Sequence, residues 1–202
     1  LLNTDVEVTS NWLEPLVSTI NKNSNIAAVQ PKILSYSEKN TFEYAGAAGG
    51  FIDKYGYPFC RGRVFDALEK DNGQYDDEVE IFWATGAAIL VRKELYQKLG
   101  GLDTYFFAHM EEIDLCWRLK NAGFKIFYNS ESVVYHVGGG TLSTGSAKKY
   151  FLNFRNGLIL LYKNLPKSKV FPVIFTRMVL DGIAAMQFLF KGKADVFSAI
   201  FK

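Results

Sequence analysis

The sequence predicts an α/β domain followed by a segment of C-terminal helices. Short apolar runs, typical of buried strands, alternate with helix-like segments over residues 26–136, whereas the end of the chain contains long helical stretches separated by Pro166. With 202 residues, 49% of them hydrophobic, the chain is long enough for one domain with a sizeable core. We place the main division at residue 146, between an α/β part (1–146) and a helical segment (147–202).

Charge and cysteine content exclude several classes of protein. The 23 basic and 21 acidic residues give a formal charge of +2, which argues against a nucleic-acid partner. Cys60 and Cys116 lack the paired spacing of a zinc site, so we expect two reduced, mostly buried thiols in a cytosolic setting, with a disulfide between them as the minor alternative. The segment Leu1–Val8 does not have the pattern of a signal peptide, and we expect the chain to be part of a longer polypeptide.

The first elements follow from apolar spacing. Hydrophobic residues recur with helical spacing between Trp12 and Asn23, and Ser10 or Asn11 can cap that helix. The run Ile26–Ile33 predicts a buried strand that a proline closes. Residues 35–80 are rich in glycine and aromatic side chains without a sustained period, which predicts a functional loop region.

The middle of the chain predicts a second strand and two short helices. Val79–Val91 is apolar enough for a central strand interrupted at Gly86. A short helix over 92–99 ends at two glycines, and a largely buried helix over 111–121 ends at Gly123. Two brief strands, 125–128 and 133–136, follow.

Helices are predicted over 147–165, 171–190 and 194–201. The apolar stretch from Val170 to Phe190 contains Arg177 and Asp181 and is followed by Lys191, so we expect no simple transmembrane helix. Apolar helix faces with lysines around them fit a peripheral membrane role, and they fit a hairpin packed on the α/β part equally well.

Three carboxylates open the helix that starts at residue 111. Glu111, Glu112 and Asp114 lie where the helix dipole favours anions, and Asp114 can pair with Arg118 one turn later; both are purely structural explanations. However, the apolar run Phe106–Met110 just before them can desolvate a carboxylate. Desolvation raises the pKa of a carboxyl group toward a value useful for a general base.

Polar residues also gather at strand ends. His136 ends an apolar strand before Gly138–Gly140, whose backbone N–H groups can approach an anion, although a histidine there is often a core residue. Lys148, Lys149 and Arg155 follow and can meet phosphate or face water. Asp5 stands at a strand end before a helix, and with a diphosphate and His136 it would suit Mg²⁺ or Mn²⁺ rather than zinc.

Five segments, in their order along the chain, resemble family 2 glycosyltransferases of the rhamnosyltransferase-like and galactofuranosyltransferase-like branch: Leu1–Val8, Trp12–Leu16, Ala84–Arg92, Gly100–Asp103 and Glu111–Arg118. The resemblance covers essentially the whole chain, from the D-x-D-type motif onward. It implies a GT-A fold with a mixed sheet, truncated before Leu1, where the family holds its nucleotide. We therefore expect this chain by itself to have little activity.

The resemblance also implies roles for individual residues. Asp5 matches the motif residue that binds the divalent cation, with Asn3 supporting its geometry. The catalytic base falls on Glu112 with Glu111 as the supporting acid, but the family's usual Asp is replaced by Glu112, which leaves the choice between the two open. Asp114 is implied as a further catalytic acid, and His136 as a metal or diphosphate ligand. Cofactor contacts are implied for Gly138, Gly139 and Arg155, with Arg155–Asn156 and the glycine loop as a flexible cover. The acceptor would contact Trp83, Thr85 and Gly86.

The resulting hypothesis is a metal-dependent inverting glycosyltransferase of bacterial cell-surface polysaccharide synthesis. It would use Mg²⁺ or Mn²⁺, a nucleotide-sugar donor and a glycan or lipid-linked acceptor, in the cytoplasm at the inner face of the plasma membrane. The sheet edge left by the missing half predicts a homodimer. The alternative is a non-catalytic membrane-proximal interaction module, and a metal-dependent phosphohydrolase ranks last because two histidines are too few for its water-activating cluster.

Overall fold

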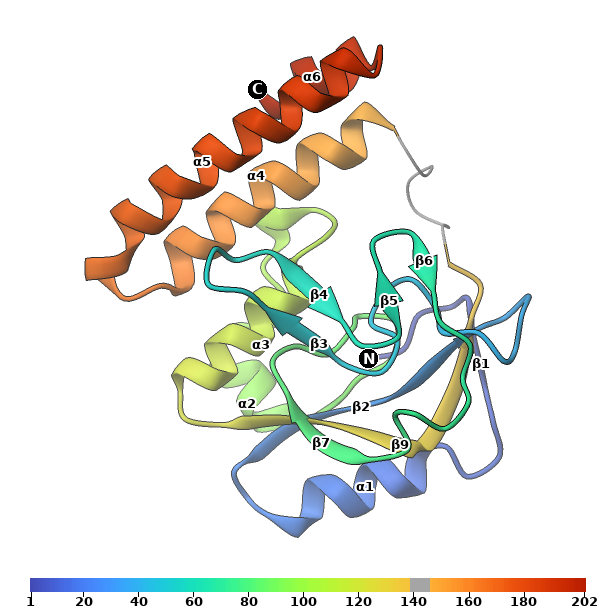
Figure 1. Cartoon of the computed structure of the whole chain (residues 1–202). Helices are drawn as coiled ribbons and strands as arrows, with labels where there is room; N and C mark the ends of the chain where they lie inside the picture. The colour runs from blue at the N-terminus through green and yellow to red at the C-terminus, as the bar shows by residue number, and fades with distance from the viewer. Residues whose placement is uncertain (139–145) are drawn as a thin grey trace. The chain divides into compact units, whose positions relative to one another are not determined.

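The computed structural model describes residues 1–138 and 146–202, which form two compact units (Figure 1). The first unit contains Leu1–Ile52, Pro58–Leu102 and Glu112–Gly138. The second contains Asp53–Tyr57, Asp103–Glu111 and, among the described residues, 146–202.

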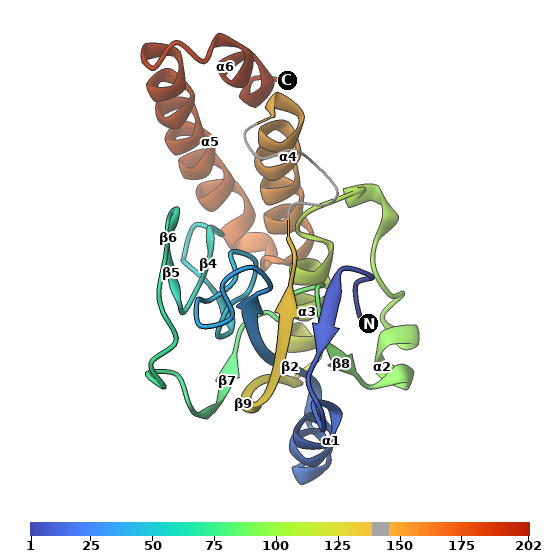
Figure 2. The same cartoon turned by 90° about the vertical axis from the view of Figure 1, so that its right-hand side faces the viewer.

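The first unit is built on a five-stranded mixed sheet, as the sequence predicts. Its main path is β1 (Val6–Val8), β9 (Lys125–His136), β2 (Ile26–Ser35) and β8 (Leu90–Val91), and β7 (Glu78–Ile81) pairs with β9. Strands β2 and β9 are parallel, and the other pairs are antiparallel. Figure 2 shows β1 beside the C-terminal half of β9, where Val6 lies opposite His136.

Strands β2 and β9 are both longer than predicted. The two brief strands expected at 125–128 and 133–136 form one strand, because the polar residues between them are held by hydrogen bonds: Asn129 Nδ2 donates to Thr19 Oγ1 over 2.9 Å, and Ser132 Oγ donates to the Trp12 carbonyl over 2.5 Å. Strand β2 continues through Pro31, where the ladder shifts register, as expected where a proline cannot donate.

The prediction of one central strand over residues 79–91 is wrong. Residues Glu78–Ile81 form β7 on one side of β9, and Leu90–Val91 form β8 beside β2. The intervening residues, 82–89, cross from β7 to β8 without forming a strand of their own. Asn3 N donates to the Ala87 carbonyl of this crossing segment over 2.9 Å. This crossing segment contains the predicted acceptor contacts.

Helices lie on both sides of the sheet (Figures 1 and 2). Helix α1 (Leu13–Lys22) packs Leu16 and Ile20 against Ile26 and Val29. The predicted cap is wrong, because Trp12 occupies the N-cap position and no side chain caps the helix. On the other side lie α2 (Lys93–Lys98) and α3 (Glu111–Asn121), both close to their predicted ranges.

The loop region predicted over 35–80 contains two small hairpins. Strands β3 (Gly50–Ile52) and β4 (Pro58–Cys60) form one, and β5 (Arg63–Val64) and β6 (Ala67–Leu68) form the other. Cys60 and Cys116 are both buried and free, which confirms the predicted thiols.

The second unit is mainly helical. It contains the one-turn helix η1 (Thr104–Phe106), α4 (Ala147–Asn164), α5 (Lys167–Phe190) and α6 (Ala194–Ile200). Helix α5 begins four residues before its predicted start and includes Pro172. By length and composition alone, α5 is long and apolar enough to cross a membrane, and the expectation that it is no simple transmembrane helix stays a prediction. The predicted anion loop (Gly139, Gly140, Thr141, Ser143, Thr144) lies outside the described residues.

Candidate active site

A histidine between two carboxylates lies at the C-terminal end of β9. His136 Nε2 is 3.3 Å from Asp5 Oδ1, and His136 Nδ1 is 3.5 Å from Glu43 Oε2. The backbone fixes this arrangement, because Val6 lies opposite His136 in the ladder and Val137 N donates to the Asp5 carbonyl over 3.1 Å. Asp5 and His136, which the sequence predicts to act together, therefore lie side by side.

The environment of His136 favours its charged form. Its pKa is raised, chiefly by the contact with Glu43, while burial opposes the shift and the charges of Glu43 and Asp5 add to it. The contact with Glu43 is an ion pair rather than a hydrogen bond, since Nδ1 has no partner of hydrogen-bond geometry among the residues that the structure describes. Glu43 is itself 8% exposed, so its carboxylate is held beside the ring in a mostly buried position.

Asp5 and His136 offer two donor atoms of the kinds that a divalent cation accepts, provided that His136 gives up the proton on Nε2. Asp5 offers a carboxylate whose side chain is 34% exposed, and His136 turns Nε2 toward it. Glu43 faces the other ring nitrogen, which is where metal-binding histidines usually meet an orienting carboxylate. Within the described residues, no group of three or more His, Cys, Asp or Glu side chains is arranged to hold a metal ion, so Asp5 and His136 could be only part of a ligand set.

Gly138 has a steric reason to be glycine. Its φ is +71°, and a Cβ at this position would lie 2.8 Å from Glu43 Oε1. Gly138 was predicted as a cofactor contact, and here it gives Glu43 room beside His136. Gly139, the neighbouring predicted contact, lies outside the described residues.

The predicted acceptor segment is held by buried polar contacts. Thr85 N donates to Gln30 Oε1 over 2.8 Å, and Gln30 Nε2 donates to the Gly46 carbonyl over 3.0 Å. Trp83 is 5% exposed and donates from its indole to the Phe51 carbonyl over 2.7 Å. Thr85 and Trp83 therefore serve as supports. Between Trp83 and Ile89, Gly86 is the one residue that is not buried.

Gly86 brings this segment to the predicted base. A Cβ on Gly86 would lie 3.8 Å from Glu112 Cβ, so the glycine backbone lies beside the first turn of α3. On the other side, the Asn3–Ala87 backbone hydrogen bond joins the crossing segment to the turn that contains Asp5, directly before β1. The first unit therefore connects Glu112, Gly86 and Asn3 through short contacts.

Glu111 and Glu112 occupy the first turn of α3, where the helix dipole favours their charged forms. Burial has the opposite effect on Glu111 and raises the pKa of its carboxyl. This is the shift that the apolar run before the helix predicts, and a carboxyl with a raised pKa is suited to holding a proton.

Asp114 has a different environment. It is fully buried and accepts from Arg118 Nε over 2.8 Å, while Arg118 also donates to the carbonyls of Leu99 and Gly101. This ion pair was the structural explanation weighed in the sequence analysis. It fixes the loop after α2 against α3, and it gives Asp114 a supporting place in the structure.

Arg155 and Asn156 lie in α4 of the second unit and not in a flexible cover. Arg155 Nη2 donates to the carbonyls of Tyr105 and Phe106, both over 3.2 Å. Asn156 is fully buried and donates to three carbonyls of the same segment, those of Phe106, Ala108 and His109. Both side chains therefore hold the segment that leads into Glu111.

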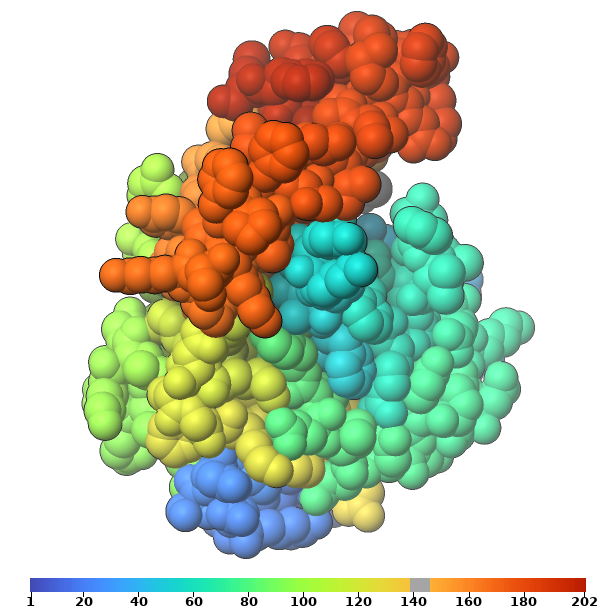
Figure 3. All heavy atoms as spheres, turned by 60° about the vertical axis from the view of Figure 1, so that its left-hand side comes forward, coloured from blue at the N-terminus to red at the C-terminus, as the bar shows by residue number. Residues whose placement is uncertain are grey.

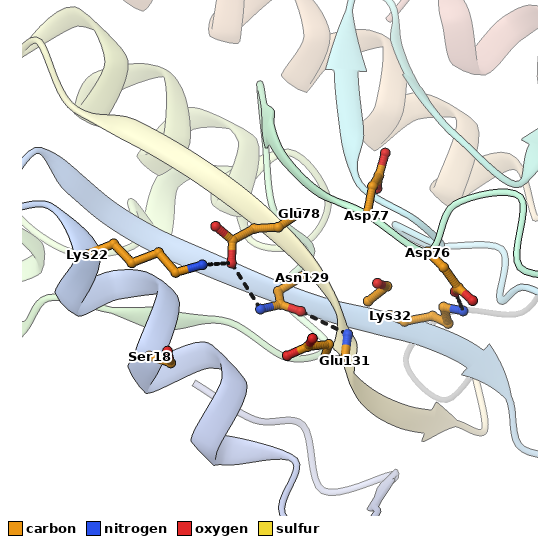
Figure 4. A pocket seen from close by; sticks show the side chains of 9 residues that line it. Ser18, Lys22, Lys32, Asp76, Asp77, Glu78, Asn129 and Glu131 are labelled. Carbon is orange, nitrogen blue, oxygen red and sulfur yellow. Dashed lines mark hydrogen bonds and ion pairs between the residues drawn. The ribbon is translucent and has the colours of Figure 1, made fainter.

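A separate polar cavity of about 540 Å³ lies in the first unit (Figure 4). Its charged side chains are mostly paired with one another or with neighbours: Lys32 with Asp76 at 2.5 Å, Lys22 with Glu78 at 2.7 Å, and Asp77 with Arg61 at 2.7 Å. The cavity borders Asn129 and Glu131, whereas the candidate site adjoins His136 at the end of the same strand. We do not assign it a role in catalysis.

Sequence reasoning missed Glu43, Gln30 and the packing role of Asn156. Glu43 lies in the irregular region, where nothing in the spacing marks one acid among aromatic and glycine residues. Gln30 is a polar residue within a largely apolar strand, and this mismatch was the available signal, because a buried amide needs partners.

Comparisons with known proteins agree with the fold and the class. No family model matches the chain. The chain is 27% identical over 136 residues to the O-antigen biosynthesis protein RfbC of Myxococcus xanthus, which is 67% of this chain and 10% of that protein. It is 28% identical over 156 residues to the pre-mycofactocin glycosyltransferase of Mycobacterium tuberculosis, covering 74% and 29% of the two chains.

A third relative is the N-acetylglucosaminyl-diphospho-decaprenol L-rhamnosyltransferase of Mycobacterium tuberculosis, 34% identical over 65 residues, which are 32% of this chain and 21% of that protein. The chain thus spans less than a third of each of these relatives. A crystal structure of GalNAc-T7 with UDP, GalNAc and Mn²⁺ matches with a TM-score of 0.55 and 17% identity, over 80% of this chain and 30% of that one. The structural match confirms the GT-A fold, and the sequence matches agree with the predicted glycosyltransferase class.

Proposed function

We propose that this chain, which has the GT-A fold and resembles family 2 glycosyltransferases, carries the catalytic and acceptor side of an enzyme of cell-surface polysaccharide synthesis. The enzyme would move a sugar from a nucleotide-sugar donor to a glycan or lipid-linked acceptor. One observation carries the proposal: Glu112 lies beside Gly86. The segment that contains Gly86 is in turn hydrogen-bonded to Asn3, and Asn3 precedes Asp5 by two residues.

The base would act on the acceptor. A sugar hydroxyl is a poor nucleophile until a carboxylate accepts its proton in the transition state. We assign that task to Glu112, with the partly buried Glu111 beside it as the supporting acid. The acceptor oxygen forms a bond to the anomeric carbon, the bond from that carbon to the diphosphate breaks, and the leaving diphosphate keeps the electron pair. Direct displacement of this kind inverts the configuration at the anomeric carbon.

Asp5 and His136 would hold a divalent cation, Mg²⁺ or Mn²⁺. When bound, the cation offsets charge on the departing diphosphate. Glu43 and Gly138 support this assignment, because they orient the His136 ring and leave room for it. The GT-A neighbour was crystallised with UDP and Mn²⁺, which agrees with a cation at a site of this fold.

The remaining parts of the proposal concern partners and place. The rhamnosyltransferase relative is named for a decaprenol-linked acceptor, which supports a lipid-linked acceptor here and a position at the inner face of the plasma membrane. A hexosyl donor, a division of roles near residue 146, and a homodimer through a sheet edge complete the hypothesis. Because the chain spans less than a third of these relatives, we expect little transfer by these 202 residues alone.

Calorimetry with UDP and Mn²⁺ tests the proposal without requiring the acceptor. We expect the full-length protein to bind UDP only when Mn²⁺ is present, and Asp5→Ala to abolish the dependence on Mn²⁺ while the fold persists by circular dichroism. Glu7→Ala, two residues later in β1, is the matched control and should bind as the parent does. Absence of UDP binding together with capture by liposomes would favour the non-catalytic membrane-proximal module, which the apolar helix α5 supports.

A further inference from the structure

The two charges inside α5 face the interior of the second unit. Arg177 and Asp181 are 3% and 5% exposed, and Arg177 Nε donates to both carboxylate oxygens of Asp181 over 2.9 and 3.0 Å. The Tyr57 hydroxyl donates to Asp181 over 2.7 Å, and the Arg177 guanidinium lies 3.6 Å from the centroid of the Tyr57 ring. The pair is thus neutralised within the unit.

The opposite face of α5 is apolar and open. Figure 3 shows the side chains of this helix, in orange to red, at the surface of the molecule. Large hydrophobic residues that are more than a third exposed recur along it at helical spacing: Phe171, Phe175, Met178, Val179, Ile183, Met186, Leu189 and Phe190. At about 1.5 Å per residue, the stripe is about 29 Å long. Exposed apolar patches of this extent mark interaction sites.

Positive charge surrounds the stripe. Lys167 and Lys169 lie at the start of α5, and Lys191 and Lys193 lie just after its end. Residues 146–202 contain ten basic and two acidic side chains, whereas the rest of the chain contains 13 basic and 19 acidic ones. One of the two acids, Asp181, is already paired inside the unit. The charge of the whole chain hides this asymmetry.

We propose that the exposed face of α5, from Phe171 to Phe190, docks in the plane of a lipid bilayer that carries anionic headgroups. A long apolar stripe rimmed by lysines fits this partner, because the stripe can enter the acyl boundary while the ammonium groups meet the headgroups. The inference deepens the proposed function, on which it rests for the lipid-linked acceptor.

Two other occupants fit the helix less well. A second copy would place lysines against lysines at both ends of α5, in a parallel as well as in an antiparallel pairing, since both ends are basic. A membrane-spanning arrangement would surround the whole helix with lipid, yet Arg177 and Asp181 hold one face of it to Tyr57. Docking in the plane leaves these contacts intact.

Vesicle co-sedimentation of the full-length protein tests this proposal. We expect binding to vesicles that contain an anionic phospholipid, weaker binding to zwitterionic vesicles, and release by alkaline carbonate. The double variant Phe175→Glu/Ile183→Glu should weaken binding about tenfold or more. The control Phe65→Glu, at an 87% exposed aromatic of the β5–β6 turn in the first unit, should bind as the parent does.

Several outcomes would overturn the proposal: no binding by the parent, undiminished binding by the double variant, or resistance to carbonate, which would indicate a spanning helix. A parent dimer that the double variant converts to a monomer, without lipid binding, would assign the face to a second copy. Thermal unfolding by circular dichroism checks that each variant is folded. Vesicle binding requires no donor sugar. If the parent bound vesicles but transferred no sugar to a soluble acceptor, the proposed function would be contradicted and the membrane-docking proposal would not.

Discussion

The side-chain amide of Asn156 donates a hydrogen bond to the main-chain carbonyl of His109 over 2.8 Å. His109 has a φ of +69°, and its neighbours Phe107 and Met110 have φ values of +65° and +75°. Such conformations cost a residue other than glycine of order 1–3 kcal/mol and persist only where surrounding contacts hold them. The strained segment runs directly into Glu111 and Glu112, so Asn156 acts as a positioning residue for the start of α3.

Replacement of Asn156 by Ala should therefore impair catalysis as well as stability. The change removes the donor for three carbonyls, and we expect a loss of about 3 kcal/mol in the free energy of unfolding, measured by urea titration. Well below the unfolding transition, kcat for sugar transfer should fall while the KM for the donor changes little. Asn153→Ala, one turn earlier in the same helix, is the control, and equal kcat values for the two variants would exclude a positioning role.

His109 should make stability depend on pH. Burial, and secondarily the charge of Lys149, lower its pKa below the ordinary value of 6.5, and its Nε2 is buried without a hydrogen-bond partner among the described residues. The folded state then binds a proton less readily than the unfolded state. The resulting stability is present above about pH 6.5 and is lost as the pH falls through the lowered pKa.

The measurement for His109 is urea unfolding between about pH 7.5 and about pH 5.5. The parent should lose more stability over this range than His109→Gln, which cannot gain the charge. Because the raised pKa of His136 contributes with the opposite sign in both proteins, the difference between them isolates His109. Parallel pH curves for the two proteins would refute the assignment.

Cys116 should resist alkylation in the folded protein. Its side chain is fully buried, and burial raises the pKa of its thiol to about 12. At about pH 8 only a very small fraction is thiolate, which is the reactive form. Peptide mapping after iodoacetamide should find Cys116 unmodified in the native protein and modified in guanidinium. Complete modification under native conditions would mean that the helix face toward Ala84 opens readily.

Glu43→Gln should weaken binding of Mn²⁺ by about tenfold, because loss of an orienting carboxylate typically costs a metal site 10–100-fold in affinity. The side chain keeps its size, so the space beside Gly138 stays filled. Calorimetry with Mn²⁺ alone measures the effect without catalysis. The control Glu131→Gln, at an exposed position of β9, the strand that contains His136, should bind as the parent does, and unchanged affinity in Glu43→Gln would remove His136 from the ligand set.

The sequence was sufficient for elements whose signals are local. Helix α3 matches its predicted range, because its acidic start and Gly123 mark both ends. It was insufficient where distant partners decide the structure. Polar residues divide β9 in the sequence, yet contacts to α1 keep it one strand, and the run predicted as one strand over 79–91 divides because β9 and β2 pair with its two ends.

The candidate site shows the same division. The order of the motifs predicted Asp5, His136, Gly86 and Glu112 as site residues. In the first unit, Asp5 contacts His136, and Gly86 lies beside Glu112. Glu43 could not be predicted, because it reaches His136 from an irregular segment 93 residues earlier, and no period or motif marks it. The sequence likewise could not predict that Arg177 and Asp181 point inward, because this direction depends on their contacts with Tyr57.

Sugar transfer by Glu112→Gln in the full-length protein tests the central claim most directly. The change keeps the shape of the side chain beside Gly86 and removes its ability to accept a proton. We predict that kcat falls by at least about a hundredfold, within the range of general-base catalysis, while UDP and Mn²⁺ bind as in the parent. Transfer at the parent rate by Glu112→Gln, and also by Glu111→Gln, would contradict the assignment of the base to this helix.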